Sequence, residues 1–188
     1  MRPSDAAAVP FRGLEMDTPY TVEGVSVGMA AMDLVPVVLY GTGCHMVGKR
    51  LRNPLFTAGA VVSTASGAGK AAWKMIQATT GKNVFWLADQ MHRVMPAGFA
   101  AMAAAPLVGS NRDAANALLR ASASQPALGF FATGAAGMGL MGYWARALDP
   151  TKSRSNWIEQ TTNVAAQAAF FAGVVSAVLA SERAGAAE

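Results

Sequence analysis

Hydrophobic residues along the chain gather into five long runs that short polar stretches separate. The runs cover residues 26–47, 54–78, 84–109, 126–147 and 157–181. Each run reaches about 20 residues, the length that an α-helix needs to cross the hydrocarbon core of a bilayer. The pattern therefore predicts an all-α fold, a polytopic membrane helix bundle with five transmembrane helices.

The stretch between the third and fourth runs is ambiguous. Residues 112–124 have a helical pattern, with Arg112 and Arg120 two turns apart, but they are too short to span a bilayer by themselves. We expect a short interfacial helix here. The alternative is a sixth transmembrane helix, bent at Gln125 and Pro126.

The composition agrees with a single membrane domain. Of the 188 residues, 53% are hydrophobic and 14% are charged, whereas soluble domains have about 25% charged residues. Glycine is plentiful, and small residues let helices approach closely in lipid. The domain covers residues 26–181. Residues 1–25 form a polar N-terminal lead-in without the apolar segment of a signal peptide, and residues 182–188 form a short polar tail.

The formal net charge of +4 comes from basic residues near the ends of the apolar runs. The positive-inside rule and attraction to anionic headgroups account for such positions. No basic stripe with interleaved aromatic residues is present, so we expect no nucleic-acid partner. Cys44 is the only cysteine, which excludes an intrachain disulfide and a cysteine-based zinc site. We expect no metal and no other cofactor.

The basic loops predict an orientation. Lys49, Arg50 and Arg52 follow the first run, so this connection should be cytoplasmic. Five spans then place the N-terminus outside and the C-terminus inside, in a plasma (inner) membrane. One loop disagrees, because Arg146, Lys152 and Arg154 would lie outside. A sixth span would remove this conflict and place the C-terminus outside.

One stretch resembles a nucleotide-binding motif. A phosphate-binding loop needs glycine, four residues and then Gly-Lys-Ser/Thr, between a strand and a helix. Gly69 and Lys70 fit the end of this motif, but Thr64 replaces its first glycine and Ala71 its hydroxyl residue. We interpret residues 63–77 as part of a membrane helix with a small, polar face that ends in two lysines.

Polar residues inside the runs are the most informative positions. A charge in the hydrocarbon core is costly and usually faces a partner inside the bundle. Because successive helices alternate in direction, four polar groups should meet near one membrane face, the outer one in the predicted orientation. The candidate ligand-binding residues are Asp33, Lys70, Lys74, Asp89, His92, Arg93, Glu159, Gln160 and Asn163. Asn156, Gln160, Asn163 and Gln167 also form a stripe of amides, which donate and accept hydrogen bonds.

The charges in this cluster nearly balance, which favours a small polar or zwitterionic solute, or an ion, as the ligand. Lysine and arginine would hold its anionic group, a carboxylate would hold its cationic group or relay a proton, and the amides would orient it. We therefore expect a membrane protein that binds or transports such a solute. Five helices are few for a carrier, which favours a homo-oligomer or a larger membrane complex.

Two other functions remain open from the sequence. The chain could be an accessory or structural subunit, if its polar stripes face outward and pair with the helices of a partner. It could instead be an enzyme acting on lipid headgroups, although no metal-binding or nucleophile motif supports catalysis. The basic residues could also extend to the headgroups or lock two helices together without any ligand.

Overall fold

The computed structural model describes residues 20–109 and 111–185. Within them the chain forms helices only: α1 Val27–Leu51, α2 Pro54–Thr80, α3 Trp86–Val108, α4 Arg112–Ser122, α5 Ala127–Ala147 and α6 Ser153–Gly185. The all-α prediction is confirmed. Most of the predicted lead-in (residues 1–19) and the last part of the predicted tail (residues 186–188) lie outside the described residues.

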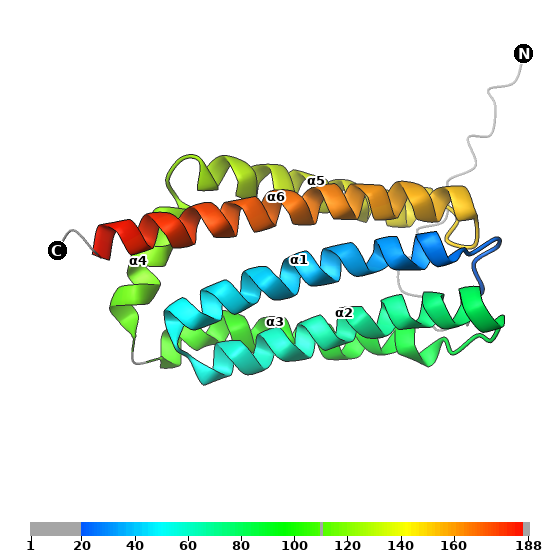
Figure 1. The fold of residues 1–188 in the computed structure, drawn as a ribbon, viewed down its shortest axis with the longest axis horizontal. Helices are drawn as coiled ribbons and strands as arrows, with labels where there is room; N and C mark the ends of the chain where they lie inside the picture. Colours follow the sequence, from blue (N-terminus) through cyan, green and yellow to red (C-terminus); the bar gives the residue numbers. More distant parts are fainter. Residues whose placement is uncertain (1–19, 110, 186–188) are drawn as a thin grey trace, which may run out of the picture.

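The five long helices lie side by side with alternating directions (Figure 1). Helix α1 is central: it packs against α2 on one side and α6 on the other, while α3 packs on α2 and α5 packs on α6. Each hairpin pairs consecutive helices across a short connection. The start of α1, the end of α2 and the starts of α3 and α6 consequently share one end of the bundle.

Helix α4 crosses the opposite end of the bundle, where it joins the α2–α3 hairpin to the α5–α6 hairpin (Figure 1). It buries Ala114, Ala115 and Ala121 and packs mainly on α6. Its 11 residues rise only about 16 Å, roughly half of a hydrocarbon core of about 30 Å. The helix is therefore too short to cross a bilayer by itself, and its interfacial position stays a prediction.

Capping residues fix where the helices begin. The Ser26 hydroxyl accepts from Met29 N–H at 3.2 Å, and the Asn53 carboxamide accepts from Leu55 N–H at 2.9 Å. Asn53 is buried and also donates to the Ala105 carbonyl at 2.8 Å, which ties the α1–α2 turn to the end of α3. A single side chain thus satisfies free backbone groups at two helix ends.

Glycines allow the close approach of paired helices. A methyl group added at Gly59 would lie 2.6 Å from the Gly98 carbonyl oxygen, and one added at Gly98 would collide with the Ser63 hydroxyl. On the other hairpin, a methyl group at Gly137 would lie 2.7 Å from the Cβ of Ala166. Backbone contact of this kind is how small residues pack helices in a membrane.

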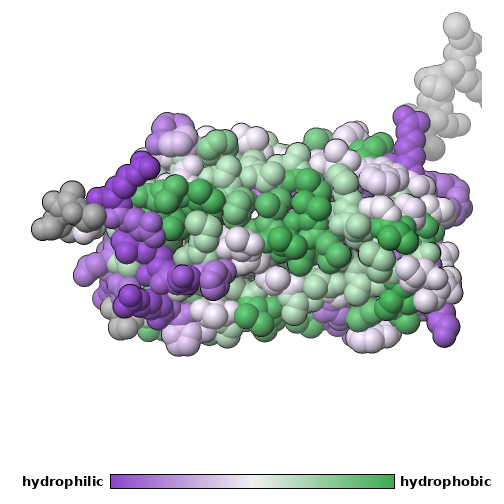
Figure 2. Space-filling view, in the orientation of Figure 1, coloured by the Kyte–Doolittle hydropathy of each residue, from purple (hydrophilic) through white to green (hydrophobic). Residues whose placement is uncertain are grey.

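The distribution of residue types between interior and surface is inverted relative to a soluble protein. Large apolar side chains are exposed on every long helix; Val38 is 63% exposed and Leu107 is 78% exposed. The buried residues are mostly alanine, serine and other small or polar side chains, with Trp73 and Met29 as the largest fully buried ones. Figure 2 shows apolar side chains across the middle of one face and hydrophilic side chains at the ends. Exposed apolar surface on this scale calls for an apolar surrounding or a partner.

Two of the described helices, α1 and α6, are long and apolar enough to cross a membrane by length and composition. This gives weak support for a membrane location. Of the other predicted spans, α2 and α5 contain many glycine, serine or threonine residues, and α3 carries three charged or titratable side chains near its start. The five-span count stays a prediction.

A buried polar cluster at one end of the bundle

A buried ion pair joins the central helix α1 to α2. The Lys74 ammonium lies 3.1 Å from Asp33 Oδ2, and the two residues are only 4% and 8% exposed. Among the described residues, this oxygen has no polar partner other than the Lys74 ammonium. Removing two charges from water is costly, and the pair alone offsets that cost only in part.

Gln160 brings α6 into the same cluster. It is 3% exposed, and its amide has one orientation in which both ends are satisfied. In this orientation the amide oxygen accepts from Lys74 Nζ at 2.6 Å, and the amide nitrogen donates to the Met29 carbonyl at 2.9 Å. The opposite orientation would turn the amide nitrogen toward an ammonium and the oxygen toward a carbonyl, so we assign the first. Asp33, Lys74 and Gln160 thus link the three central helices.

Further charges surround this triad. Lys70 lies one turn before Lys74 on α2, and Glu159 precedes Gln160 on α6; both are half-buried. Glu159 interacts electrostatically with Lys70, Lys74 and Asp33. Two basic and two acidic groups therefore share one region between α1, α2 and α6, as the alternation of helix directions predicts. Asn163 is half-buried one turn further along α6.

The predicted residues on α3 are arranged differently. Arg93 pairs with Asp89 of the same helix at 3.0 Å, and the Arg93 side chain is 74% exposed. His92 is also exposed. The α3 side chain that does reach the interior is Gln90: its amide donates to the Ser66 carbonyl at 2.8 Å, and the Ser66 hydroxyl donates to it at 3.1 Å. This pair joins α3 to α2.

The segment before α1, residues 20–25, crosses the end of the bundle beside the cluster. Tyr20 packs edge-on against Trp73 and Phe85, with ring centroids 5.6 and 5.3 Å apart, and interacts electrostatically with Lys70 and Glu159. The Tyr20 carbonyl accepts from Asn83 in the α2–α3 connection at 3.1 Å. Burial raises the pKa of the Tyr20 hydroxyl. The segment covers the cluster on the side of α2 and α3.

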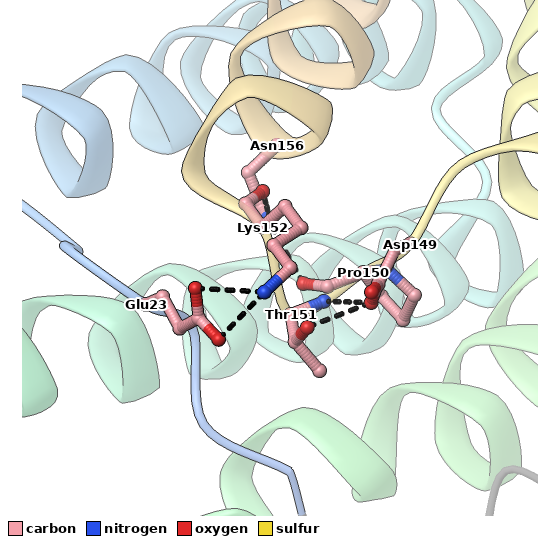
Figure 3. A network of polar contacts seen from close by, with 6 residues as sticks. All are labelled: Glu23, Asp149, Pro150, Thr151, Lys152 and Asn156. Atoms are coloured by element: carbon pink, nitrogen blue, oxygen red, sulfur yellow. Dashed lines mark hydrogen bonds and ion pairs between the residues drawn. The ribbon is translucent and has the colours of Figure 1, made fainter.

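On the other side, the same segment is held by the α5–α6 connection (Figure 3). Lys152 Nζ donates to both carboxylate oxygens of Glu23, at 2.8 and 3.0 Å, and Glu23 N–H donates to the Thr151 carbonyl at 2.7 Å. The hydrogen bonds and charge of Glu23 raise the pKa of the Lys152 ammonium. The Asn156 amide donates to the Pro150 carbonyl at 2.7 Å and fixes this connection on α6. We call Tyr20 to Val25 the cover segment.

Sequence reasoning missed the residues that hold the cover segment. Gln77 is buried and donates to the Val22 carbonyl at 3.1 Å, and Trp73 donates to Asn83 at 2.8 Å. Their partners are backbone carbonyls or loop side chains, which leave no periodic signal in the sequence. The polarity of Gln77, one turn after Lys74 on the polar face of α2, was the only available sign.

Among the residues that the structure describes, no three His, Cys, Asp or Glu side chains come close enough together to hold a metal ion. The cluster offers an ammonium, a carboxylate and an amide within one buried region, which suits hydrogen bonding and charge pairing with a small polar group. No protein-family model, curated protein or solved structure matches the chain. Function is therefore argued from the cluster itself.

Proposed function

We propose that this chain is an integral membrane protein that binds or transports a small polar or zwitterionic solute. Helices α1, α2, α3, α5 and α6 would be its five spans, with α4 at the interface. The exposed apolar side chains on all five long helices support the spans. The alternating directions of the five helices support a cluster confined to one membrane face (Figure 1).

The observation that carries the solute site is the buried Asp33–Lys74 pair, whose Asp33 Oδ2 meets no polar partner among the described residues besides the Lys74 ammonium. A buried carboxylate oxygen with a single partner keeps capacity to accept a further donor. A solute ammonium could satisfy it, while Lys70 and Lys74 would pair with the solute's anionic group. Gln160 would fix the orientation of both. Entry would require the cover segment to move, because it crosses the cluster's end of the bundle.

The experiment that tests this function is native mass spectrometry of the full chain, extracted gently from its own membrane. We expect an adduct of constant small mass on the wild-type protein. The double variant Asp33→Asn with Lys74→Met should lose it, since both charges are gone and neither is left unpaired. Arg93→Gln, on the exposed side of α3, is the matched control and should keep the adduct. Equal adducts on all three proteins would refute the site.

The orientation is part of the proposal. The basic connection after α1 would be cytoplasmic, so the cluster and cover segment would face outward, from a plasma membrane. In a Cys44→Ser background, a membrane-impermeant maleimide added to intact cells should label Thr80→Cys and spare Ser124→Cys. These two positions lie at opposite ends of the bundle and are both exposed. Labelling of both or of neither would contradict a spanning bundle, and the reverse pattern would invert the orientation.

A second candidate function, that of an accessory subunit, is favoured by one feature of α5. Methyl groups added at Gly139 and Gly142 would meet nothing within 4 Å, so these glycines face outward. An outward small-residue face suits close docking of another membrane helix, from a second copy or from a larger complex. The same mass spectra separate the two functions, because a stable polypeptide adduct without a small molecule would favour the accessory role.

A further inference from the structure

A second polar feature lies at the end of the bundle that is opposite the buried cluster. There, the end of α1, the end of α6 and the crossing helix α4 enclose a partly open groove of about 1050 Å³. Neither the cluster nor the cover segment reaches it. Hydrophilic side chains gather at this end of the molecule in Figure 2, at the margin of the apolar surface. We call it the basic groove.

Its lining carries an excess of positive charge. Four cations line the basic groove, Lys49, Arg50, Arg52 and Arg120, against the two carboxylates Asp113 and Glu182. In the part of the chain that the structure describes, none of the four cations forms an ion pair with a carboxylate. The groove cations therefore lack a counter-ion from the described chain.

Arg50 is positioned to receive such a counter-ion. One terminal nitrogen of its guanidinium donates to the Ser181 carbonyl at 3.0 Å, which anchors the half-buried side chain to the last turns of α6. Its Nε is fully buried and has no hydrogen-bond partner among the described residues. A guanidinium presents the donors that the Ser181 bond leaves free in a planar fork that fits phosphate oxygens.

The position of the basic groove along the bundle indicates the source of its ligand. Leu119 is 64% exposed on α4 and stands directly before the exposed Arg120, so an apolar and a cationic side chain reach outward from adjacent positions. This arrangement is typical of a helix at the level of lipid headgroups. Basic pockets between helices on the cytoplasmic side of a membrane suit anionic headgroups.

We propose that the basic groove binds a phosphate group, which Arg50 and Arg120 hold by charge-assisted hydrogen bonds and Lys49 and Arg52 attract. A phosphate of an anionic lipid headgroup and a soluble phosphate share this chemistry. The position of the groove at the level of the headgroups favours the lipid, and this choice of ligand rests on the proposed membrane location. The binding of phosphate by the groove cations does not rest on it. The site is separate from the solute cluster, so either one can fail without the other.

The test measures lipid retention on the detergent-purified full chain by native mass spectrometry, with phosphatidylglycerol and phosphatidylcholine supplied in equal amounts. We expect preferential retention of phosphatidylglycerol. The double variant Lys49→Gln with Arg120→Gln leaves the Arg50–Ser181 bond intact and should weaken retention by roughly fivefold for each cation removed. Arg50→Gln should weaken it too, and Arg50→Lys should restore only part of it, because lysine keeps the charge and loses the fork. Arg154→Gln, at the opposite end, is the matched control for Arg50→Gln because each removes one positive charge, and it should retain phosphatidylglycerol like the wild type.

A second arm distinguishes the two sources of phosphate. If millimolar inorganic phosphate stabilises the wild type against thermal unfolding and the double variant is indifferent to it, while phosphatidylglycerol shows no preference, the ligand is soluble and the groove is still a phosphate site. Equal retention of phosphatidylglycerol by the wild type and the double variant, with no effect of inorganic phosphate, would overturn the proposal. Unfolding midpoints of the variants exclude loss of fold as the cause, and the double variant decides if Arg50→Gln proves unstable.

Discussion

Breaking the Asp33–Lys74 pair from one side should destabilise the protein far more than removing both charges. Lys74→Met leaves a buried carboxylate without a cation and leaves the Gln160 amide oxygen without its donor. Removing one member of a buried pair typically costs about 3–5 kcal/mol. We expect about 3 kcal/mol, at the low end, since polar groups of a chain unfolded within lipid or detergent also find partners.

The double variant Lys74→Met with Asp33→Asn should recover most of this loss. Neither partner is then charged, so no buried charge is left without a counter-charge. We expect the double variant to lose about 1 kcal/mol of unfolding free energy. This loss is smaller than the sum of the two single losses by at least about 2 kcal/mol. The free energy of unfolding would be measured in mixed micelles by titration with a denaturing detergent.

The matched control is the Asp89–Arg93 pair on α3, whose members are spaced four residues apart and whose arginine is mostly exposed. Its coupling energy should stay below about 0.5 kcal/mol, the range of exposed helix pairs. Single losses at Asp33 and Lys74 below about 1 kcal/mol, or losses that simply add, would refute the reasoning that this pair is a dry, coupled unit. In that case water must reach the cluster in the resting protein.

Three further outcomes follow from the geometry. Gly59→Ala should lower the unfolding free energy by about 1–3 kcal/mol, because the added methyl group would lie 2.6 Å from the Gly98 carbonyl oxygen. Gly139→Ala should not lower it, because its methyl group would meet nothing within 4 Å. Thermal unfolding of the two variants checks both expectations. The raised pKa of Lys152 means that its ion pair stabilises the fold below the ordinary lysine value of 10.5 and loses this effect as pH rises through the raised value. Lys152→Met should therefore lower the unfolding midpoint at pH 8 and have less effect as the pH rises beyond 10.5. Asn53→Ala removes a helix cap and the bond to the Ala105 carbonyl, and should cost about 2 kcal/mol in the same unfolding assay, which a loss below about 0.5 kcal/mol would contradict.

The helices were predictable because residues near their ends determine where they begin and stop. The predicted spans match α2, α3 and α5 to within two residues, since Pro54 opens α2 and proline or glycine residues surround the ends of α5. Helix α1 runs past the predicted end at residue 47 to Leu51, because Lys49 and Arg50 in its last turn continue a helix beyond an apolar run and complement its dipole. Helix α6 also extends beyond its apolar run, because polar residues continue it backward from residue 157 to Ser153.

The cluster was predictable only in part. Alternating helix directions are enough to bring Asp33, Lys74 and Glu159 to one end of the bundle, because position along a helix fixes depth. Position along a helix does not determine which side of the helix faces the bundle interior. The sequence therefore did not distinguish Gln160, which enters the triad, from Arg93, which stays on the exposed side of α3. The path of the cover segment depends on bonds to loop carbonyls and carries no periodic pattern.

Several cations at the cluster end are paired within the chain, whereas the four cations of the basic groove are not, and this difference bears on how the protein responds to its surroundings. At the cluster end, Lys74, Arg93 and Lys152 each have a carboxylate of this chain within 3.1 Å. A solute or a change of pH must compete with these contacts. At the basic groove, no carboxylate of the described residues forms an ion pair with the cations, which leaves them free to bind an anion from outside. Anionic lipid should therefore stabilise the protein by an amount that Arg120→Gln reduces and Asp33→Asn leaves unchanged, because the two ends lie too far apart to screen one another.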